Sequence, residues 1–562
     1  MVSDSAASGE RTVVRIGILA RSDLVFQNWE LRLFERIAND PRFEIVALIV
    51  DGRVPVTTRT GWLAKLTTDK PINRLMWRLC QALDRRAARE HLRVPAPKFT
   101  ALQSRITKVL VTPQSLKFVD HFSDADRAAV KDLGLDVLLR HGFGIIKGQI
   151  LTAAWHGIWS FHHADNRVNR GMPAGFWEAA LGEPVTGATL QVLTPELDGG
   201  RVIGRCAQNT IANAQRNQRA IYELSVSLIW RELQKLARKS TVATTPSLVY
   251  SGPLYTNPTA LQSTGYIIRR LASVAKGIGR KLSARAGRRP SMWSLAVGNT
   301  PFEQTALWRT RETMPPPNRF WADPFLLQRD DGLYVFFEEF DYALQRGWIS
   351  AGRVVGQTIE YLGAVIDAGY HMSFPFVFQH DGQIYMIPET GVKRRVELWR
   401  AVEFPTRWTL ERTAFEGTDI ADTTLFEFDG TWWLFANISQ TPDVDFCNEL
   451  HVFAVDGPGL KTIVPHQDNP VVIDSRFARN GGRPYVRDGR LYRPSQSNIG
   501  GVYGRGLNVM EVTALSLTAY EERLACSATP EFRPGLVGIH HLDATGGTFI
   551  IDTCRANGGR GT

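Results

Sequence analysis

The sequence is poor in cysteine and has no long apolar run, and both absences exclude classes of protein. Five cysteines are scattered singly along the chain without a CxxC pair: Cys80, Cys206, Cys447, Cys526 and Cys554. A zinc ribbon and a disulfide framework are therefore not expected. No run of about 18 or more apolar residues occurs, which argues against a transmembrane helix. The segment Met1–Arg11 lacks the apolar stretch of a secretory signal, so we expect a cytoplasmic protein.

The length and the charge of the chain set its broad class. A chain of 562 residues is too long for one core and indicates roughly two to four domains. A hydrophobic content of 44% and a charged content of 22% are typical of globular proteins. The net charge of +10 is gathered mainly in residues 53–117 and 269–289. Because the positive charge is concentrated in these two segments and is not spread over the whole molecule, we expect no nucleic-acid partner.

The first part of the sequence has the pattern of a parallel α/β domain. Apolar runs of strand length alternate with segments of helical spacing, and residues 53–115 form a basic insertion. The expected strands are Val13–Leu19, Phe43–Val50, Leu135–Leu139 and Gly157–His162, and the expected helices are Trp29–Ile37 and Gln218–Ala237. We therefore assign residues 1–12 to a disordered N-terminus and residues 13–238 to an α/β domain.

Residues 239–300 are expected to form a basic linker. Within it, five apolar residues fall on one helical face: Ile267, Leu271, Val274, Ile278 and Leu282. Eight Lys or Arg and no acidic residue lie between Arg269 and Arg289. A basic amphipathic helix can lie on an anionic membrane, so residues 266–289 are a candidate for peripheral membrane contact. A solvated helix packed on one of the domains is the alternative.

From residue 301 onward the sequence is rich in β patterns and repeats itself. Short apolar strands lead into a tight turn and then an aromatic strand, which is a strong hairpin signal. The turns are Asp331-Gly332, Asp381-Gly382, Asp429-Gly430, Asp488-Gly489 and Gly546-Gly547. A repeat of several strands at this spacing is typical of propeller blades, so residues 301–562 predict an all-β, five-bladed propeller.

The segment Trp159–Val202 resembles the signature region of 10-formyltetrahydrofolate-dependent formyltransferases. The pieces that carry the resemblance, in the family's order, are Ser160-Phe161-His162, Arg170-Gly171, Thr186-Gly187 and Leu197-Asp198-Gly199-Gly200. The resemblance covers roughly residues 13–235 and implies a Rossmann-like formyltransferase fold with 10-formyltetrahydrofolate as formyl donor. It also implies a pteridine-binding loop formed by Gly142, Phe143, Gly144, Ile145 and Ile146.

The resemblance implies roles for three residues in the transfer of the formyl group to an amine. His162 would accept the amine proton or help to hold the tetrahedral oxyanion, and Asp198 would orient its ring. Ser160 stands where the family has an asparagine that donates to the oxyanion. Loss of one such donor typically costs about 100- to 1000-fold in rate, so either Asn166 or His163 substitutes or the domain is slow or only binds. Asn166 and Arg170 are the candidate contacts to the acceptor.

The repeats resemble the five-bladed propeller of glycosidases and sucrases, and more closely the propeller-like N-terminal region of plant glucosamine inositolphosphorylceramide transferases. The segments that carry this resemblance are Trp321–Phe325, Ser373–Phe376, Pro388–Thr390 and Asp422–Leu425. Inner strands of a propeller line its channel, which predicts that five side chains converge there to bind carbohydrate: Asp323, Glu389, Asp422, Arg483 and His541. Ser373–Phe376 lacks the acid that such glycosidases often carry, which argues against hydrolysis.

Together these features predict a formyltransferase whose acceptor is an amino sugar of a nucleotide-sugar or glycan precursor, with no metal site. Two alternatives remain open. One is a non-catalytic glycan-binding or scaffold protein with a degenerate formyltransferase domain. The other is a glycan-processing enzyme whose site lies in the propeller.

Overall fold

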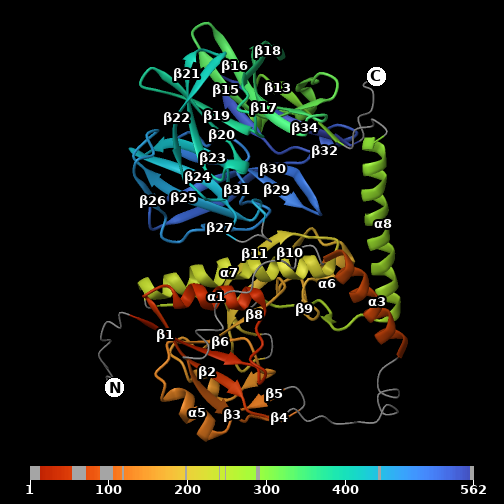
Figure 1. The fold of residues 1–562 in the computed structure, drawn as a ribbon, viewed down its shortest axis with the longest axis vertical. Helices are drawn as coiled ribbons and strands as arrows, with labels where there is room; N and C mark the ends of the chain where they lie inside the picture. Colours follow the sequence, from red (N-terminus) through yellow and green to blue (C-terminus); the bar gives the residue numbers. More distant parts are fainter. Residues whose placement is uncertain are drawn as a thin grey trace. The chain divides into compact units, whose positions relative to one another are not determined.

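The computed structural model describes residues 13–53, 71–88, 106–116, 119–196, 199–239, 241–246, 248–285, 291–440 and 445–556. The predicted N-terminal segment 1–12 lies outside these residues. The chain divides into two compact units, the first built mainly from residues before Ile268 and the second mainly from Ile268 onward (Figure 1).

The first unit is built on a mixed sheet in which the described residues contribute seven strands, in the order β11-β10-β8-β6-β1-β2-β3. Neighbours from β3 to β8 run parallel, and β10 runs antiparallel to β8. The strands are β1 (Val14–Ala20), β2 (Phe43–Asp51), β3 (Thr107–Val111), β6 (Val137–Arg140), β8 (Ile158–His162), β10 (Val185–Val192) and β11 (Arg201–Asn209). The α/β prediction is thus confirmed, whereas β3 lies in the segment that the sequence assigned to an insertion.

Helices of the first unit bury rows of apolar residues against the sheet or against one another. The helices are α1 (Asn28–Ala38), α3 (Pro71–Ala88), α5 (Asp124–Lys131), α6 (Phe176–Leu181) and α7 (Ala214–Lys239). In α1 a capping box between Gln27 and Glu30 closes the first turn, and the i, i+4 spacing of Trp29, Leu33 and Ile37 buries one face. Figure 1 shows α1 and α7 side by side, and the two helices are in contact.

Short elements complete the first unit and place its loops. They are β4 (Gln114–Leu116), β5 (Val119–His121), β7 (Ile145–Lys147), β9 (Arg170–Gly171), β12 (Leu254–Tyr255) and the 3-10 turn η2 (Gln149–Thr152). β7 pairs with β5, and β9 pairs with β12. These pairings hold the loops that follow β6 and β8 at one end of the main sheet.

In the part of the second unit that the structure describes, antiparallel strands form five sheets of four or five strands each. One sheet joins the two ends of the unit and contains β13 (Ser291–Gly298), β14 (Arg311–Thr313), β32 (Leu536–Gly538), β33 (Leu542–Thr545) and β34 (Thr548–Ala556). The next two sheets along the chain contain β15 (Arg319–Arg329), β16 (Gly332–Asp341), β17 (Arg346–Val355) and β18 (Thr358–Ile366), and then β19 (Ser373–His380), β20 (Gln383–Glu389), β21 (Val396–Glu403) and β22 (Arg407–Ala414). The last two contain β23 (Ile420–Phe428), β24 (Thr431–Ile438), β25 (Glu449–Val455), β26 (Ile463–Pro465) and β27 (Val472–Ile473), and then β28 (Tyr485–Arg487), β29 (Arg490–Ile499), β30 (Val502–Leu515) and β31 (Tyr520–Ala528).

The predicted tight turns lie between the paired strands. Asp381-Gly382, Asp429-Gly430, Asp488-Gly489 and Gly546-Gly547 all have positive φ at both residues. This is the backbone of a type I′ hairpin turn, which favours Asp and Gly at these positions. The five hairpin predictions are confirmed, because the Asp331-Gly332 turn also joins two paired strands, β15 and β16.

The first strand of the second unit begins before the predicted domain boundary at residue 301. β13 lies inside the range 239–300 that the sequence assigned to a linker, and it pairs antiparallel with the last strand, β34, from Ser291–Ala556 to Gly298–Phe549. No local turn signal marks β13 because its partner is at the far end of the chain. The beginning and the end of the unit therefore share one sheet.

The same range contains the long helix α8 (Ala260–Arg285), as its apolar spacing predicts. Ile267 packs among apolar residues of the first unit, whereas Leu271, Val274, Ile278 and Leu282 are exposed. None of the helices in the described ranges is long and apolar enough to cross a bilayer.

Candidate functional sites

A pocket of about 180 Å³ lies in the first unit, beside the carboxyl ends of β6 and β8. Ser160 and His162 line it from β8, and Ile145 and Ile146 line it from β7. The wall opposite is formed by residues of the segment 191–200. The structure therefore gathers four of the predicted reaction-centre and pteridine-contact residues around one cavity.

Arg140, which the sequence did not single out, lies next to Ser160 in this pocket. Its Nη1 donates a hydrogen bond to Ser160 Oγ at 3.2 Å, and its Nη2 donates to the carbonyl oxygens of Phe143 and Gly144 at 3.1 and 2.7 Å. Nε of Arg140 is buried and has no hydrogen-bond partner. Burial lowers the pKa of this guanidinium, which the charge of Asp120 partly offsets. A cationic donor thus lies beside Ser160, the residue for which the sequence resemblance led us to expect an asparagine.

His162 is oriented by the backbone of the loop that follows β8. Its Nε2 lies 2.9 Å from the carbonyl oxygen of Asn169. Since a carbonyl oxygen only accepts hydrogen bonds, Nε2 carries the hydrogen and Nδ1 is the proton acceptor of the neutral ring. Asp198, the predicted partner of this ring, lies outside the described residues.

The glycine-rich stretch after β6 is held by backbone contacts. A Cβ on Gly142 would lie 2.6 Å from the carbonyl carbon of Ala20, so the two segments touch through their backbones. Phe143 has a φ of 66° and packs against Phe122, and Gly144 donates its N–H to Asp120 at 2.6 Å. These three residues do not line the pocket; they hold the loop from which Ile145 and Ile146 do so.

Asn166 and Arg170 are engaged in contacts within the protein. The side-chain oxygen of Asn166 accepts a hydrogen bond from Arg205 at 3.0 Å. Arg170 donates to the carbonyl oxygens of Asn166 and Leu248, and its guanidinium lies over the ring of Tyr250. Their predicted role in acceptor binding stays a prediction, although Nδ2 of Asn166 is buried without a hydrogen-bond partner.

His163, the neighbour of His162, lies in an aromatic cluster instead of the pocket. Its ring stacks on Phe161 and contacts Tyr222 and Trp29 at centroid distances of 4.3 and 5.5 Å. Burial, with the charges of His162 and His141, lowers the pKa of His163 to about 3. The ring is therefore neutral at physiological pH, and it does not line the pocket that contains Ser160 and His162.

In the second unit, backbone bulges deliver carboxylates from the first strands of two sheets. The strand register shifts between Ala322 and Phe325 and between Ala421 and Thr424, and the bulged residues Asp323 and Asp422 have φ values of 52° and 47°. β19 has the same bulge, but there the residue with positive φ is Phe374. A β-bulge changes the direction of the side chain at the extra residue. The bulges therefore explain why the side chains of Asp323 and Asp422 do not follow the regular alternation of side chains along their strands.

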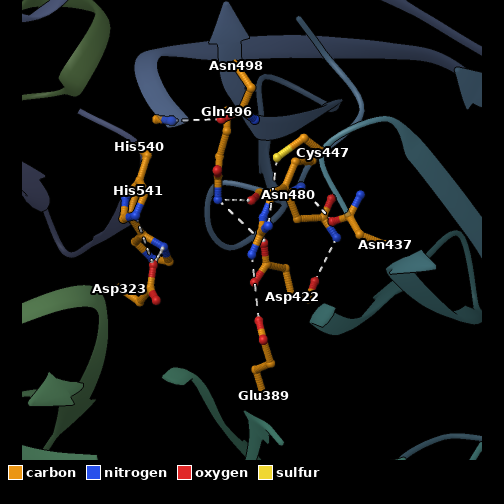
Figure 2. A network of polar contacts seen from close by, with 12 residues as sticks. Asp323, Glu389, Asp422, Asn437, Cys447, Asn480, Gln496, Asn498, His540 and His541 are labelled. Carbon is orange, nitrogen blue, oxygen red and sulfur yellow. Dashed lines mark hydrogen bonds and ion pairs between the residues drawn. The ribbon is translucent and has the colours of Figure 1, made fainter. Parts of the chain in front are cut away.

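Arg479 links Asp422 to Glu389 (Figure 2). Its Nε lies 2.6 Å from Asp422 Oδ2, and its Nη2 lies 3.8 Å from Glu389 Oε2. Gln496 Nε2 and Asn480 Nδ2 also donate to Asp422, to its carboxylate and its carbonyl oxygen respectively. Burial and the charge of Asp422 raise the pKa of Glu389 well above its usual range. The pair therefore shares one cation and retains a proton.

Asp323 lies beside two adjacent histidines (Figure 2). Its Oδ1 is 3.9 Å from Nε2 of His540 and 3.7 Å from Nδ1 of His541. Nδ1 of His540 lies 2.6 Å from Oδ2 of Asp552, whose carboxylate also accepts the backbone N–H groups of Asp323, His540 and His541. Asp552 thus fixes both the histidine ring and the backbone around it.

Protonation in this cluster follows burial and the density of carboxylates. Burial raises the pKa of Asp323 to about 7, and burial with neighbouring carboxylates raises that of Glu338 well above its usual range. Burial opposes the charge on His540, but Asp552 raises its pKa, whereas burial lowers the pKa of His541 to about 3. The cluster therefore carries protons near neutral pH that a bound cation would displace.

Several buried polar atoms in this region have no hydrogen-bond partner. They include both ring nitrogens of His541, Oε1 of Gln496 and Nδ2 of Asn498. Nδ1 of His540 also lacks hydrogen-bond geometry, and its 2.6 Å contact with Asp552 is an ion pair. Buried polar atoms are nearly always satisfied in native proteins, so a group of unsatisfied atoms around one centre indicates a place for a ligand or an ion. Arg483 binds Asp543 at 3.0 Å and lies over Phe376, and its predicted role in carbohydrate binding stays a prediction.

Sequence reasoning found Asp323, Glu389, Asp422 and His541 but missed most of their partners. The missed residues are Glu338, Arg479, Gln496, His540 and Asp552. Glu338 and Asp552 lie on strands β16 and β34 that follow tight turns, but nothing in the sequence says which face of a strand is central. Arg479 lies in a loop that carries no repeat signal. The adjacency of His540 to His541 was the one available clue.

Comparison with known proteins gives a match to the second unit. Residues 304–533 match the family described as glucosamine inositolphosphorylceramide transferase 1, N-terminal. Glucosamine inositolphosphorylceramide transferase 1 of Oryza sativa subsp. japonica is 35% identical over 237 residues, which are 41% of this chain and 32% of the relative. The Arabidopsis thaliana protein of that name is 33% identical over 304 residues, which are 48% of this chain and 39% of the relative. The matched region thus spans less than two-fifths of these relatives.

Solved structures similar to the first unit include a phosphoribosylglycinamide formyltransferase from Anaplasma phagocytophilum. It covers 43% of this chain and 96% of its own, with 14% identity and a TM-score of 0.27. A likeness this distant carries no assignment of activity.

Proposed function

We propose that the first unit transfers a formyl group from 10-formyltetrahydrofolate to an amine, and that the second unit binds carbohydrate. The observation that carries the proposal is the pocket that joins Ser160, His162, Ile145 and Ile146. At about 180 Å³ it is smaller than the roughly 300–1,000 Å³ of most ligand sites. It suits one ring system of a folate, with the remainder of the molecule outside.

In this proposal, Arg140 and His162 of the pocket divide two roles of acyl transfer between them. The amine nitrogen attacks the formyl carbon, and the carbonyl electrons form an oxyanion. Arg140, with a free buried Nε beside Ser160, donates to that oxyanion in place of the family's asparagine. His162 takes the amine proton at Nδ1 and returns it to the leaving folate nitrogen as the carbon–nitrogen bond to the folate breaks.

The acceptor we propose is an amino sugar. The support comes from the second unit, in which residues 304–533 are similar to a region of transferases named for glucosamine. We propose that the five sheets are blades of a ring closed by the β13–β34 pairing, with the carboxylate cluster at its centre. Ionised or hydrogen-bonding carboxylates suit the hydroxyl and amino groups of such a sugar.

A formyl-transfer assay with matched variants tests this proposal. Purified chain is incubated with 10-formyltetrahydrofolate and glucosamine or a nucleotide-linked amino sugar, and N-formyl product is measured by mass spectrometry. Wild type is expected to form product, and His162→Gln is expected to lose about 100-fold or more, within the range for a general base. His121→Gln changes an exposed histidine of β5 and should leave the rate unchanged. Absence of product from every amine, together with no binding of 5-formyltetrahydrofolate, would reject the donor.

The geometry of the second unit favours binding over hydrolysis. Glycosidases hold two carboxyl groups about 5–5.5 Å apart when they retain configuration and about 6.5–9.5 Å apart when they invert it. Glu389 and Asp422 instead share one guanidinium, and the Asp422 carboxyl acts on Glu389 through a hydrogen bond. The ring of Tyr503 is 44% exposed and packs against Arg479 and His540, where a sugar face can stack.

Calorimetry with amino sugars tests the carbohydrate site separately. Tyr503→Ala is expected to weaken binding severalfold, whereas Trp308→Ala, which removes another exposed aromatic side chain of the same unit, is expected to have no effect. Equal weakening by both variants would contradict a site at Tyr503.

We also propose that α8 contacts an anionic membrane surface. Its exposed apolar side chains recur at helical spacing: Leu261, Ile268, Leu271, Ile278 and Leu282. The helix contains six Lys or Arg and no acidic residue. An apolar row flanked only by cations matches the apolar boundary and the negative charge of such a membrane.

A further inference from the structure

The carboxylate of Asp323 is buried and poorly satisfied. Asp323 is 7% exposed. In the described part of the chain, no side chain or backbone group donates a hydrogen bond to its carboxylate oxygens. The nearest polar atoms are the two imidazole nitrogens of His540 and His541, at 3.9 and 3.7 Å. These distances are too long for hydrogen bonds, so direct contact does not explain why three polar side chains meet here.

These two nitrogen–oxygen distances match the separation between two atoms that bind the same metal ion. Imidazole nitrogens and carboxylate oxygens bind zinc at about 2.0–2.2 Å, so two such ligands lie at most about 4.2 Å apart. Both nitrogen–oxygen distances fall below this limit. One polar atom each of Asp323, His540 and Asp552 lies within 4.8 Å of the other two, so Asp552 lies directly beside the two ligands. A shared cation therefore fits between atoms that are too far apart to bond directly.

His541 gives an independent indication of a bound group. The residue is completely buried, and neither ring nitrogen has a hydrogen-bond partner. Figure 2 shows its ring directed toward Asp323. An imidazole without any polar partner is costly in a protein interior unless a ligand satisfies it.

Asp552 holds His540 as a partner carboxylate holds a metal-bound histidine. Its Oδ2 lies 2.6 Å from Nδ1 of His540, which leaves Nε2 free to face Asp323. In metal sites the second ring nitrogen of a ligating histidine is almost always bound in this way, which fixes the ring and its tautomer. The backbone N–H groups of His540 and His541 anchor the other oxygen of Asp552.

We propose that Asp323 and His540, with His541 as a further ligand and Asp552 as the orienting partner, bind a divalent transition-metal ion at the centre of the second unit. Imidazole nitrogens favour zinc and other late transition metals over calcium or magnesium. Three protein ligands leave a coordination position open, at which a hydroxyl or amino group of a sugar can bind. This inference replaces the expectation of no metal and does not depend on formyl transfer in the first unit.

The experiment measures metal bound to the full chain. Protein is stripped with chelator, reloaded with Zn²⁺, Mn²⁺ or Co²⁺, freed of excess ion and analysed by elemental mass spectrometry. One ion per chain is expected for wild type with at least one of the metals. Co²⁺ bound with four or five ligands should also give a visible absorption band stronger than that of the hydrated ion. A wild-type chain that retains none of the three ions would overturn the proposal.

Variants locate the ion. Asp323→Asn and His540→Gln are expected to lower affinity at least 100-fold and to remove the cobalt band. Asp552→Asn is expected to lower affinity about 10- to 100-fold, the usual cost of losing a partner of a ligating histidine. Unchanged affinity in Asp323→Asn and His540→Gln would place the ion elsewhere and refute this site.

A matched histidine–carboxylate pair serves as control. Nε2 of His451 lies 3.3 Å from Glu449 in another sheet of the same unit, and both are buried. His451→Gln should retain one ion per chain and the cobalt band. Thermal unfolding with and without chelator shows whether each variant folds. Wild type and His451→Gln are expected to be stabilised by the ion, whereas Asp323→Asn and His540→Gln are not. Loss of the ion in folded His451→Gln would also count against the assignment.

Discussion

Nη1 of Arg140 donates a hydrogen bond to Oγ of Ser160 at 3.2 Å, at the point where formyltransferases are expected to hold an asparagine. A guanidinium carries a full charge, so it can stabilise an oxyanion at least as well as an amide. If the first unit transfers a formyl group as proposed, Arg140 is the cationic donor beside the serine.

This relationship predicts the effect of removing the cation. Arg140→Met is expected to lower the rate of formyl transfer about 100- to 1000-fold while changing the affinity for 5-formyltetrahydrofolate little, because the donor acts mainly on the oxyanion. Steady-state kinetics and calorimetry measure the two quantities. Arg127→Met removes a surface arginine of α5 and should change neither. A large loss of folate affinity would instead assign Arg140 to cofactor binding.

The buried His163 predicts a loss of stability in mild acid. Its pKa is lowered from 6.5 to about 3 in the folded protein, so between these values the unfolded chain takes up a proton and the folded chain does not. The free energy of unfolding should therefore fall with decreasing pH by about 1.4 kcal/mol per unit from this residue. The titratable groups around His163 are His141, Glu30, Tyr222 and His162. Because the pKa of Glu30 is lowered from 4.5, this carboxylate changes the free energy of unfolding only below pH 4.5.

Hydrogen exchange measures this effect within the first unit. The opening free energy of amides in β8 and α7 is compared at pH 7.5 and 5 for wild type and His163→Gln. The variant should be less stable at pH 7.5, since it disturbs the packing with Phe161 and Tyr222, but its stability should fall less with pH. Equal pH dependence in the two proteins would show that His163 does not control acid stability.

Two glycines predict opposite effects of the same substitution. At Gly142 a Cβ would lie 2.6 Å from the carbonyl carbon of Ala20 and 2.7 Å from the nitrogen of Arg21, and neither backbone can move freely. Gly142→Ala should therefore destabilise the first unit by about 1–3 kcal/mol, as overpacking does. Gly277 lies inside α8 with open space around it, so Gly277→Ala should favour the helix by roughly 0.5–1 kcal/mol. Chemical denaturation and circular dichroism compare both variants with wild type.

The sequence predicted those elements whose signal is local. The strand β8 and the turn at Asp429-Gly430 were predicted because apolar runs and turn chemistry act between neighbours in the chain. β13 was missed because its partner β34 lies more than two hundred residues away, and β3 because a short, half-exposed strand in a basic segment has no clear periodicity.

The same distinction explains the candidate sites. Asp323 and Asp422 were found through motifs, but the bulges that re-aim them were not evident from the residues. Arg479 comes from a loop 57 residues after Asp422, and Asp552 reaches Asp323 across 229 residues. Contacts of this kind depend on sheet register, which no local pattern reveals. Sequence therefore identified the carboxylates and not the groups that set their charge.

The ion pair between Arg479 and Asp422 predicts strong coupling in the second unit. Both side chains are largely buried, so Arg479→Met leaves Asp422 and Glu389 without their shared cation and should destabilise the unit by about 3–5 kcal/mol. The double variant Arg479→Met/Asp422→Asn should be less destabilised than the sum of the two single variants. Denaturant unfolding of all four proteins gives the coupling energy. If the destabilisations of the two single variants add up to that of the double variant, the charges of Arg479 and Asp422 do not interact energetically.

The charge and exposed apolar row of α8 predict salt-dependent binding to anionic vesicles. Wild type should sediment with vesicles of phosphatidylserine and phosphatidylcholine and not with phosphatidylcholine alone. Arg270→Glu/Lys276→Glu should weaken binding roughly 30-fold or more, because each cation near an anionic surface contributes about 1 kcal/mol. Ile278→Ser/Leu282→Ser should weaken binding in low and high salt alike, since it removes apolar contact instead of charge. Leu344→Ser changes an exposed apolar residue of the second unit outside α8 and should bind as wild type does. Equal binding to neutral vesicles, or no effect of either double variant, would show that α8 is not the membrane-contacting helix.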